Sequence, residues 1–290
     1  MPVSLKPFAL LVRLPNSFTV LANVLAAMVI GSQANISWLT LTACALMSLA
    51  FYYSGMILND CVDVDEDRQN QPHRPLVSGA VPLQLAWNLA IGFMTGGLLL
   101  ASVLGKTTLL FGILLTLAIV TYDLLPRQQL FGCLVMGGCR MLNWLLILSV
   151  TDTHGVFWPY ALLVGLYTTA LTFVSRDEEY GARPWLLKWS AGTLLIGALV
   201  FIMSLNTKVD YYALKILIVV LGLSVCLHKL YRVYRDYQPA TLRSALMFFI
   251  MGMIPLDATL VLISGYPLAA LFVLVLMVPG KLLAKKLYVT

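Results

Sequence analysis

The segment from Asn59 to Asp67 places five acidic side chains within nine residues of a chain that is otherwise poor in charge. Asn59, Asp63 and Asp67 are spaced four residues apart, so a helix through them carries all three on one face. Carboxylates held this close together repel one another unless a cation lies between them. Mg²⁺ suits such oxygen ligands, and it is usually bound by one or two carboxylates together with the phosphates of a substrate. The spacing therefore predicts a Mg²⁺ site in this segment.

An arginine follows the acidic segment, at the start of the sequence Arg74-Pro75-Leu76-Val77-Ser78-Gly79. A guanidinium group beside a metal site can hold a phosphate through two parallel hydrogen bonds. Acids, metal and arginine together indicate that the substrate carries a diphosphate. The apolar stretches on both sides of the segment indicate that the rest of the substrate is a hydrocarbon.

The elements that position these residues are apolar helices. Hydrophobic residues make up 60% of the 290-residue chain and charged residues 11%, whereas soluble domains carry about 25% charged residues. No linker divides the chain, so we predict a single integral-membrane domain over residues 1–290. Its fold class is all-α: a polytopic transmembrane bundle of nine helices around a central cavity, or of ten if the last apolar segment also crosses. The candidate spans are 17–34, 37–58, 83–104, 107–124, 129–150, 156–174, 185–205, 211–228, 241–263 and 266–280.

The basic residues predict the orientation of these spans. With the N-terminus in the cytoplasm and alternating spans, only Lys106, Lys208 and Lys215 fall in the opposite loops, and a tenth crossing adds three lysines to the cytoplasmic side. The net charge of +6 thus reflects membrane topology, and we expect no nucleic-acid partner. We expect an integral protein of the inner (plasma) membrane, in contact with membrane lipid, with its acidic loops in the cytoplasm.

A second acidic patch, Asp177, Glu178 and Glu179, follows the sixth candidate span. Together the two patches hold eight of the thirteen acidic residues, and both lie on the same predicted side of the membrane. Acids on the side that usually carries cations are unusual for a solvated loop. Both patches are therefore candidates for metal binding.

The first patch resembles a known signature. Asn59-Asp60-x-x-Asp63-x-x-x-Asp67, followed by Arg74-Pro75-Leu76-x-Ser78-Gly79, resembles the first motif of the UbiA superfamily of intramembrane prenyltransferases, and its position after the second span also fits. Tyr122 with Arg127 is similar to the Tyr-x4-Lys element of that family, with arginine in place of lysine. The second motif, usually DxxxD, appears here as residues 175–179 and begins with Ser175. Asp177 or Glu178 could supply the missing ligand.

The resemblance implies Mg²⁺-dependent transfer of a prenyl group from a prenyl diphosphate to a lipophilic acceptor, usually an aromatic ring. It implies that Asp63 and Asp67 belong to one metal site and that Asp177 and Glu179 belong to another. The expected catalytic residues are Asp63, Asp67, Arg74, Arg127 and Arg140. The expected substrate contacts are Arg74, Tyr122, Arg127, Arg140, Asn143 and Arg176. The expected metal ligands are Asn59, Asp60, Asp63, Asp67, Asp177 and Glu179.

Arg140 lies about midway along the fifth candidate span. A charge at that depth costs about 2.5–3.5 kcal/mol, so it should face a cavity or a partner. Two interpretations are open: Arg140 contacts the diphosphate or the acceptor, or it pairs with Asp257 of the ninth span or with carbonyl groups and so locks the bundle. Asn143, one turn further along, can share either role.

Two other functions are open at this point. A transporter would use the acids for cation coupling, although its ionisable residues should then cluster near the membrane midplane. A non-catalytic relative would bind a prenyl lipid without releasing diphosphate, and Ser175 favours this alternative. Release of diphosphate distinguishes the enzyme from both.

Overall fold

The computed structural model describes residues 5–124, 130–180, 184–205 and 211–288; for residues 5, 177–180 and 288 it describes the backbone only. All regular secondary structure in these ranges is helical. The elements are α1 (Leu5–Leu11), η1 (Leu14–Asn16), α2 (Ser17–Gly31), α3 (Trp38–Val62), α4 (Val64–Asn70), α5 (Leu83–Leu104), α6 (Lys106–Leu124), α7 (Phe131–Val150), α8 (His154–Tyr180), α9 (Trp185–Ser204), α10 (Tyr212–Arg235), α11 (Pro239–Ile263), α12 (Pro267–Val275) and α13 (Met277–Tyr288).

Ten helical segments in the described ranges are long and apolar enough to cross a membrane, which confirms the all-α polytopic class. The doubtful tenth span is among them as Pro267–Leu287, and it consists of α12 and α13 with a break at Leu276. The third span matches the predicted limits, 83–104. By contrast, α10 continues to Arg235, beyond its predicted end at residue 228. Arg232 and Arg235 lie in its last turn, where cations interact favourably with the helix dipole.

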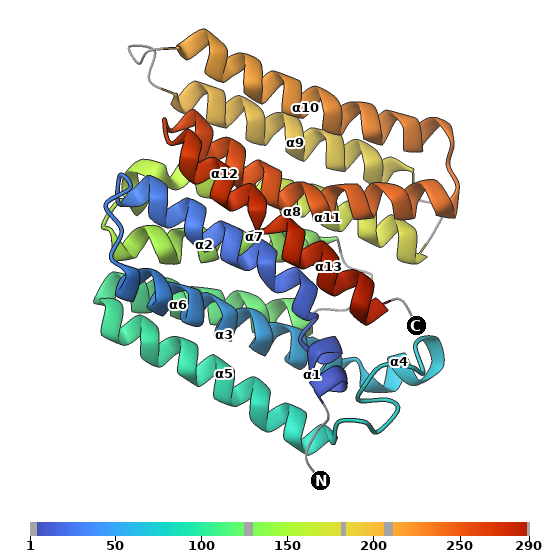
Figure 1. Ribbon diagram of the computed structural model, residues 1–290. Helices are drawn as coiled ribbons and strands as arrows, with labels where there is room; N and C mark the ends of the chain where they lie inside the picture. The colour runs from blue at the N-terminus through green and yellow to red at the C-terminus, as the bar shows by residue number, and fades with distance from the viewer. Residues whose placement is uncertain (1–4, 125–129, 181–183, 206–210, 289–290) are drawn as a thin grey trace.

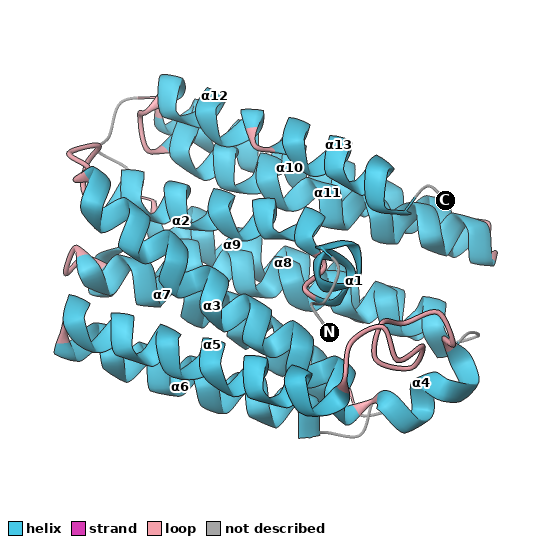
Figure 2. Ribbon diagram, turned by 60° about the horizontal axis from the view of Figure 1, so that its bottom comes forward, coloured by secondary structure: helices cyan, strands magenta, loops and turns pink. Residues whose placement is uncertain are grey.

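The helices form a bundle in which some enclose the site and others only cover it. Figure 1 shows α5 at one edge of the bundle and α10 at the opposite edge, with α2, α3, α7 and α8 between them. Figure 2 shows α1 and α4 together at one end of the bundle. Because α4 carries Asp65, Glu66 and Asp67, this end of the bundle is where the polar site forms.

Two glycines let α7 and α8 approach closely. A Cβ atom on Gly165 would lie 3.0 Å from the carbonyl oxygen of Gly137 and 2.9 Å from the Cβ of Met141. A Cβ atom on Gly137 would overlap the hydroxyl of Thr169. Small residues at a helix interface allow this backbone approach in membranes, where packing rather than hydrophobic burial drives association. The contact fixes the relative position of the two helices that carry Arg140 and Ser175.

We expect Gly137→Val to destabilise the bundle, because the added side chain has no space between α7 and α8. Overpacking of this kind typically costs about 1–3 kcal/mol. The measurement is the unfolding temperature of the detergent-solubilised protein. Gly138→Val is the matched control, since nothing lies within 4 Å of a Cβ atom at the neighbouring position. Equal unfolding temperatures for the two variants would contradict the predicted close packing.

Candidate active site

The first acidic motif lies across a break between two helices. We predicted one continuous helix, but α3 ends at Val62 and α4 begins at Val64, with Asp63 between them. The i to i−4 bonding continues through the break: the Asp63 N–H donates to the Asn59 carbonyl at 3.0 Å, and the Asp67 N–H donates to the Asp63 carbonyl at 2.9 Å. The predicted shared face therefore persists even though the single helix does not.

Burial divides the five acids of this segment into two sets. Asp60, Asp63 and Asp67 are 5%, 9% and 1% exposed, whereas Asp65 and Glu66 are exposed. Asp65 pairs with Arg68 at 3.0 Å on the outer surface, where such pairs contribute little to stability. The inward-facing acids are thus the ones that the helical spacing singled out, together with Asp60.

Arg74 lies against the inward-facing acids. Its Nη1 atom is 3.2 Å from Asp60 and also forms a short hydrogen bond with Asp67, while its Nε atom donates to Gln71 at 3.0 Å. The sequence predicted Arg74 to lie beside the acids, and the structure places it there. A guanidinium group in this position reduces the repulsion between the two carboxylates.

Arg13 also reaches this site, although sequence reasoning treated it only as a marker of topology. Its Nη2 atom lies 3.4 Å from Asp60. The backbone of Arg13 has a positive φ of 47° at the junction of α1 and η1, which bends the chain before α2 begins. No spacing rule links Arg13 to Asp60, because the two residues are 47 positions apart.

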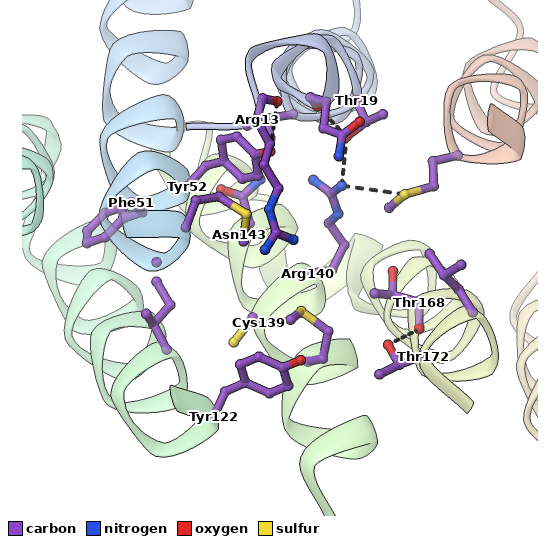
Figure 3. Close-up of a pocket in the computed structure, with 18 of the residues that line it drawn as sticks. Arg13, Thr19, Phe51, Tyr52, Tyr122, Cys139, Arg140, Asn143, Thr168 and Thr172 are labelled. Atoms are coloured by element: carbon purple, nitrogen blue, oxygen red, sulfur yellow. Dashed lines mark hydrogen bonds between the residues drawn. The ribbon is translucent and has the colours of Figure 1, made fainter. Parts of the chain in front are cut away.

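A cavity of about 310 Å³ extends inward from this end of the bundle. Its lining comes from the segment around η1 and from α2, α3, α6, α7, α8 and α11. Figure 3 shows the side chains of Arg13 and Arg140 reaching into the cavity, with Tyr52 on one side and Thr168 and Thr172 on the other. The predicted central cavity is therefore present, with polar groups at its acidic end and along one wall.

Asp123, near the end of α6, is a lining residue that sequence reasoning missed. It is 7% exposed, and its Oδ1 atom accepts a hydrogen bond of 3.3 Å from Asn59 Nδ2. Its other oxygen, Oδ2, has no hydrogen-bond partner within the described part of the chain. The sequence did contain a signal that could have identified Asp123: it is an acidic residue at the end of an apolar span, directly after Tyr122.

Arg140 faces the cavity instead of pairing directly with Asp257. Its Nη2 atom donates to Thr19 Oγ1 at 2.9 Å and lies 3.6 Å from the sulfur of Met253. Asp257 is fully buried and accepts a short hydrogen bond from Asn23. No direct Arg140–Asp257 ion pair forms between these described residues, although each is a charged neighbour of the other.

Asn143 lies one turn beyond Arg140, on the same wall of the cavity. It is 7% exposed, and its Nδ2 atom has no partner among the described residues. Ser48, a buried residue of α3, also lines the cavity and likewise has an unpartnered oxygen within the described ranges. The inner wall thus presents groups able to bind a polar part of a ligand.

The remaining predicted residues are only partly described. A Cβ atom on Gly132 would lie 3.5 Å from Arg176 Nη2 and 4.0 Å from the ring of Tyr122, so these two predicted substrate contacts converge over the start of α7. Ser175 lines the cavity. Arg127 and the side chains of Asp177 and Glu179 lie outside the described residues, and their predicted roles stay predictions.

The donor set at the acidic end fits a hard cation such as Mg²⁺. It consists of carboxylate and amide oxygens, which Mg²⁺ prefers, and it includes the unpartnered buried oxygen of Asp123. In their present arrangement, no three His, Cys, Asp or Glu side chains among the described residues already enclose a metal position.

Comparisons with known proteins point to one family. The model of the UbiA prenyltransferase family matches residues 20–253. Among curated proteins, the digeranylgeranylglyceryl phosphate synthase of Metallosphaera sedula is 29% identical over 182 residues, which cover 62% of this chain and 63% of that protein. The enzyme of the same name from Sulfurisphaera tokodaii is 29% identical over 135 residues, covering 46% of this chain and 49% of that protein. The matched regions thus span less than two thirds of these relatives.

Solved structures share the fold. A structure described as that of digeranylgeranylglyceryl phosphate synthase in membranes has a TM-score of 0.71 and 17% identity, with 90% of this chain and 98% of that chain covered. A UbiA homologue from Archaeoglobus fulgidus bound to DMAPP and Mg²⁺ has a TM-score of 0.57 and 16% identity, with 91% of this chain and 99% of that chain covered. Likenesses at these identities establish the architecture only.

We expect Arg74→Met to destabilise the protein in the absence of metal, because it removes a guanidinium group that contacts two buried carboxylates. Breaking such a buried pair typically costs about 3 kcal/mol. The measurement is thermal unfolding in the presence of a chelator. Arg68→Met, which breaks only the exposed pair with Asp65, serves as the control and should change stability by less than about 1 kcal/mol. Similar losses in both variants would refute the structural role of Arg74.

Proposed function

Because this chain belongs to the UbiA prenyltransferase family, we propose that it transfers a prenyl group from a prenyl diphosphate to a lipophilic acceptor in the membrane, in a reaction that depends on Mg²⁺. The observation that carries the proposal is the joining of an acidic patch, paired with arginines, to an apolar cavity within the same bundle. A prenyl diphosphate has the matching division into a highly charged head and a hydrocarbon tail.

The head of the donor would bind at the acidic end. Asn59, Asp63 and Asp67 would hold a Mg²⁺ ion, supported by Asp60. When bound, Mg²⁺ neutralises charge on the diphosphate and makes it a better leaving group. Arg74 and Arg13 would turn from the carboxylates toward the phosphate oxygens, which guanidinium groups bind bidentately. The same proposal includes contacts to the diphosphate from Tyr122, Arg127 and Arg176. It also includes a second metal ion, which would be held by Asp177 and Glu179.

The tail of the donor would occupy the cavity. Loss of diphosphate breaks a carbon–oxygen bond and leaves an allylic cation, which water would destroy. The cavity wall includes Phe51, Tyr52 and Tyr122, whose ring faces can stabilise a cation, and its apolar residues exclude water. The acceptor then attacks carbon and loses a proton.

The acceptor would lie against Arg140 and Asn143. A guanidinium group close to a developing allylic cation opposes its formation, unless an anion neutralises the guanidinium first. This favours an acceptor with an acidic head over a neutral one. The names of the curated relatives, digeranylgeranylglyceryl phosphate synthases, agree with an acceptor that carries a phosphate. The aromatic acceptor expected from the sequence remains compatible if it bears an acidic group.

A second candidate function is binding of a prenyl lipid without catalysis, which Ser175 favours because it replaces an acid of the second motif. Transport is less compatible with the contacts described above, because the buried acids of the first motif belong to α4 and the adjoining end of α3, and α4 lies at one end of the bundle (Figure 2). Asp257, buried within α11, is the acid that a transporter would use instead. We propose that the acidic end faces the cytoplasm, in line with the distribution of basic residues.

The first test is Mg²⁺-dependent release of diphosphate from geranyl or geranylgeranyl diphosphate by the purified protein. We expect Asp63→Asn to reduce release about 100-fold or more, because a lost electrostatic contact to the developing charge has an effect of this size. Asp65→Asn, on the exposed face of the same segment, should leave release unchanged. Unaltered release by Asp63→Asn would exclude the proposed metal site, and binding of donor without release would favour the non-catalytic alternative.

A second test concerns the acceptor. We expect Arg140→Gln to raise the KM for an acceptor with a phosphate or carboxylate head about 10-fold or more, because it removes a charged hydrogen bond. The KM for the prenyl diphosphate should change little. The same acceptor with a neutral alcohol head serves as the control, since its KM should not depend on Arg140. An equal effect on both acceptors would contradict recognition of an acidic head.

A further inference from the structure

Asp123 contributes a buried carboxylate to the cavity from α6, outside both acidic motifs. We propose that Asp123 is a cation-binding residue beside the first acidic motif and that it supplies the negative charge that Ser175 does not. The inference rests on the proposed function, because the cation is the one that would accompany the diphosphate. The family motifs quoted above do not include Asp123. In the Tyr-x4-Lys element, the matching residue is its neighbour Tyr122.

The first argument is the contact with Asn59. The hydrogen bond to Asp123 uses the amide nitrogen of Asn59, at 3.3 Å. The amide oxygen of Asn59 is therefore left for a cation, and Asp123 fixes the side chain that presents it. A carboxylate that orients a metal ligand in this way contributes to metal affinity even where it does not touch the metal.

The second argument is the unpartnered oxygen. Asp123 is more than nine-tenths buried, and its Oδ2 atom has no hydrogen-bond partner in the described ranges. Its charged neighbours are Asp63 and Asp60, which carry the same charge, and Arg13, which carries the opposite charge. One guanidinium group compensates for only part of the negative charge of three buried carboxylates, so the arrangement favours a further cation on the free side of Asp123.

The third argument is the burial of Asp123. Because the side chain is buried, solvation does not explain why an acid is found at this position. A ligand role does explain it.

The fourth argument is the shared cavity. Ser175 of α8 and Asp123 of α6 both line it, and both helices pack against α7. A serine hydroxyl cannot neutralise a divalent cation, whereas a carboxylate on another helix that lines the same cavity can. The negative charge that Ser175 does not supply from α8 would then be supplied by Asp123 from α6.

The experiment measures Mn²⁺ binding by the purified full-length protein with inorganic pyrophosphate present, followed by the EPR signal of free Mn²⁺. Asp123→Asn keeps the shape of the side chain but removes its charge. We expect the Mn²⁺ dissociation constant to rise about 10-fold or more. Asp236→Asn, at an exposed acid after α10, is the matched control and should bind Mn²⁺ as the unaltered protein does. Adding Ser175→Asp to Asp123→Asn should restore at least part of the lost affinity.

The outcomes separate this inference from the proposed function. If Asp63→Asn weakens Mn²⁺ binding and Asp123→Asn does not, Asp123 is not a ligand, while the first metal site stands. If the unaltered protein binds no Mn²⁺ with pyrophosphate, both the inference and the proposed function fail. If Asp123→Asn does not fold, Ser175→Asp alone decides: affinity should rise about threefold or more as a carboxylate is added to the same ion. Unchanged affinity in that variant would overturn the inference.

Discussion

The need to neutralise buried negative charge is the constraint on which this structure depends. Asp60, Asp63, Asp67 and Asp123 all turn away from solvent at one end of an apolar bundle. Isolated carboxylates in such surroundings are strongly unfavourable, so each requires a cation or hydrogen-bond donors. Arg74 and Arg13 meet this need in part, and a metal ion with its diphosphate would meet the rest. Segments distant in sequence are drawn to one place because their charges are complementary.

The bundle positions this charged end without filling the space behind it. Gly137 and Gly165 bring α7 and α8 together, and this contact orients the faces that carry Arg140 and Ser175 toward the cavity. The same geometry leaves a cavity of about 310 Å³ between the helices. The outer helices α5, α9 and α10 contribute no lining residue and serve to cover the inner ones. Under the proposed function, the helix ends would bind the charged head of the substrate and the helix interior would bind its tail.

Local patterns in the sequence predicted those structural features that depend only on residues close together in the chain. Apolar length predicted the spans, and four-residue spacing predicted the inward face of Asn59, Asp63 and Asp67. The break at Asp63 was not predicted, because hydrogen bonding continues across it and the spacing is unaffected. Arg13 and Asp123 were missed, since their roles depend on contacts with residues 47 and 64 positions away. The direct pairing of Arg140 with Asp257 was wrong, because complementary charge alone does not determine which of several polar groups lies nearest.

A metal site requires negative charge at particular positions around the ion. A sequence motif can therefore lose an acidic residue without loss of the metal site, provided that another residue supplies the charge. A divalent cation requires oxygen ligands at suitable distances, but it imposes no condition on the helix that supplies them. Two helices that flank a third, as α6 and α8 flank α7, can therefore exchange an acidic ligand. Under the proposed role of Asp123, the serine of the second motif is compatible with a relocated acidic ligand and does not by itself imply that catalysis is lost.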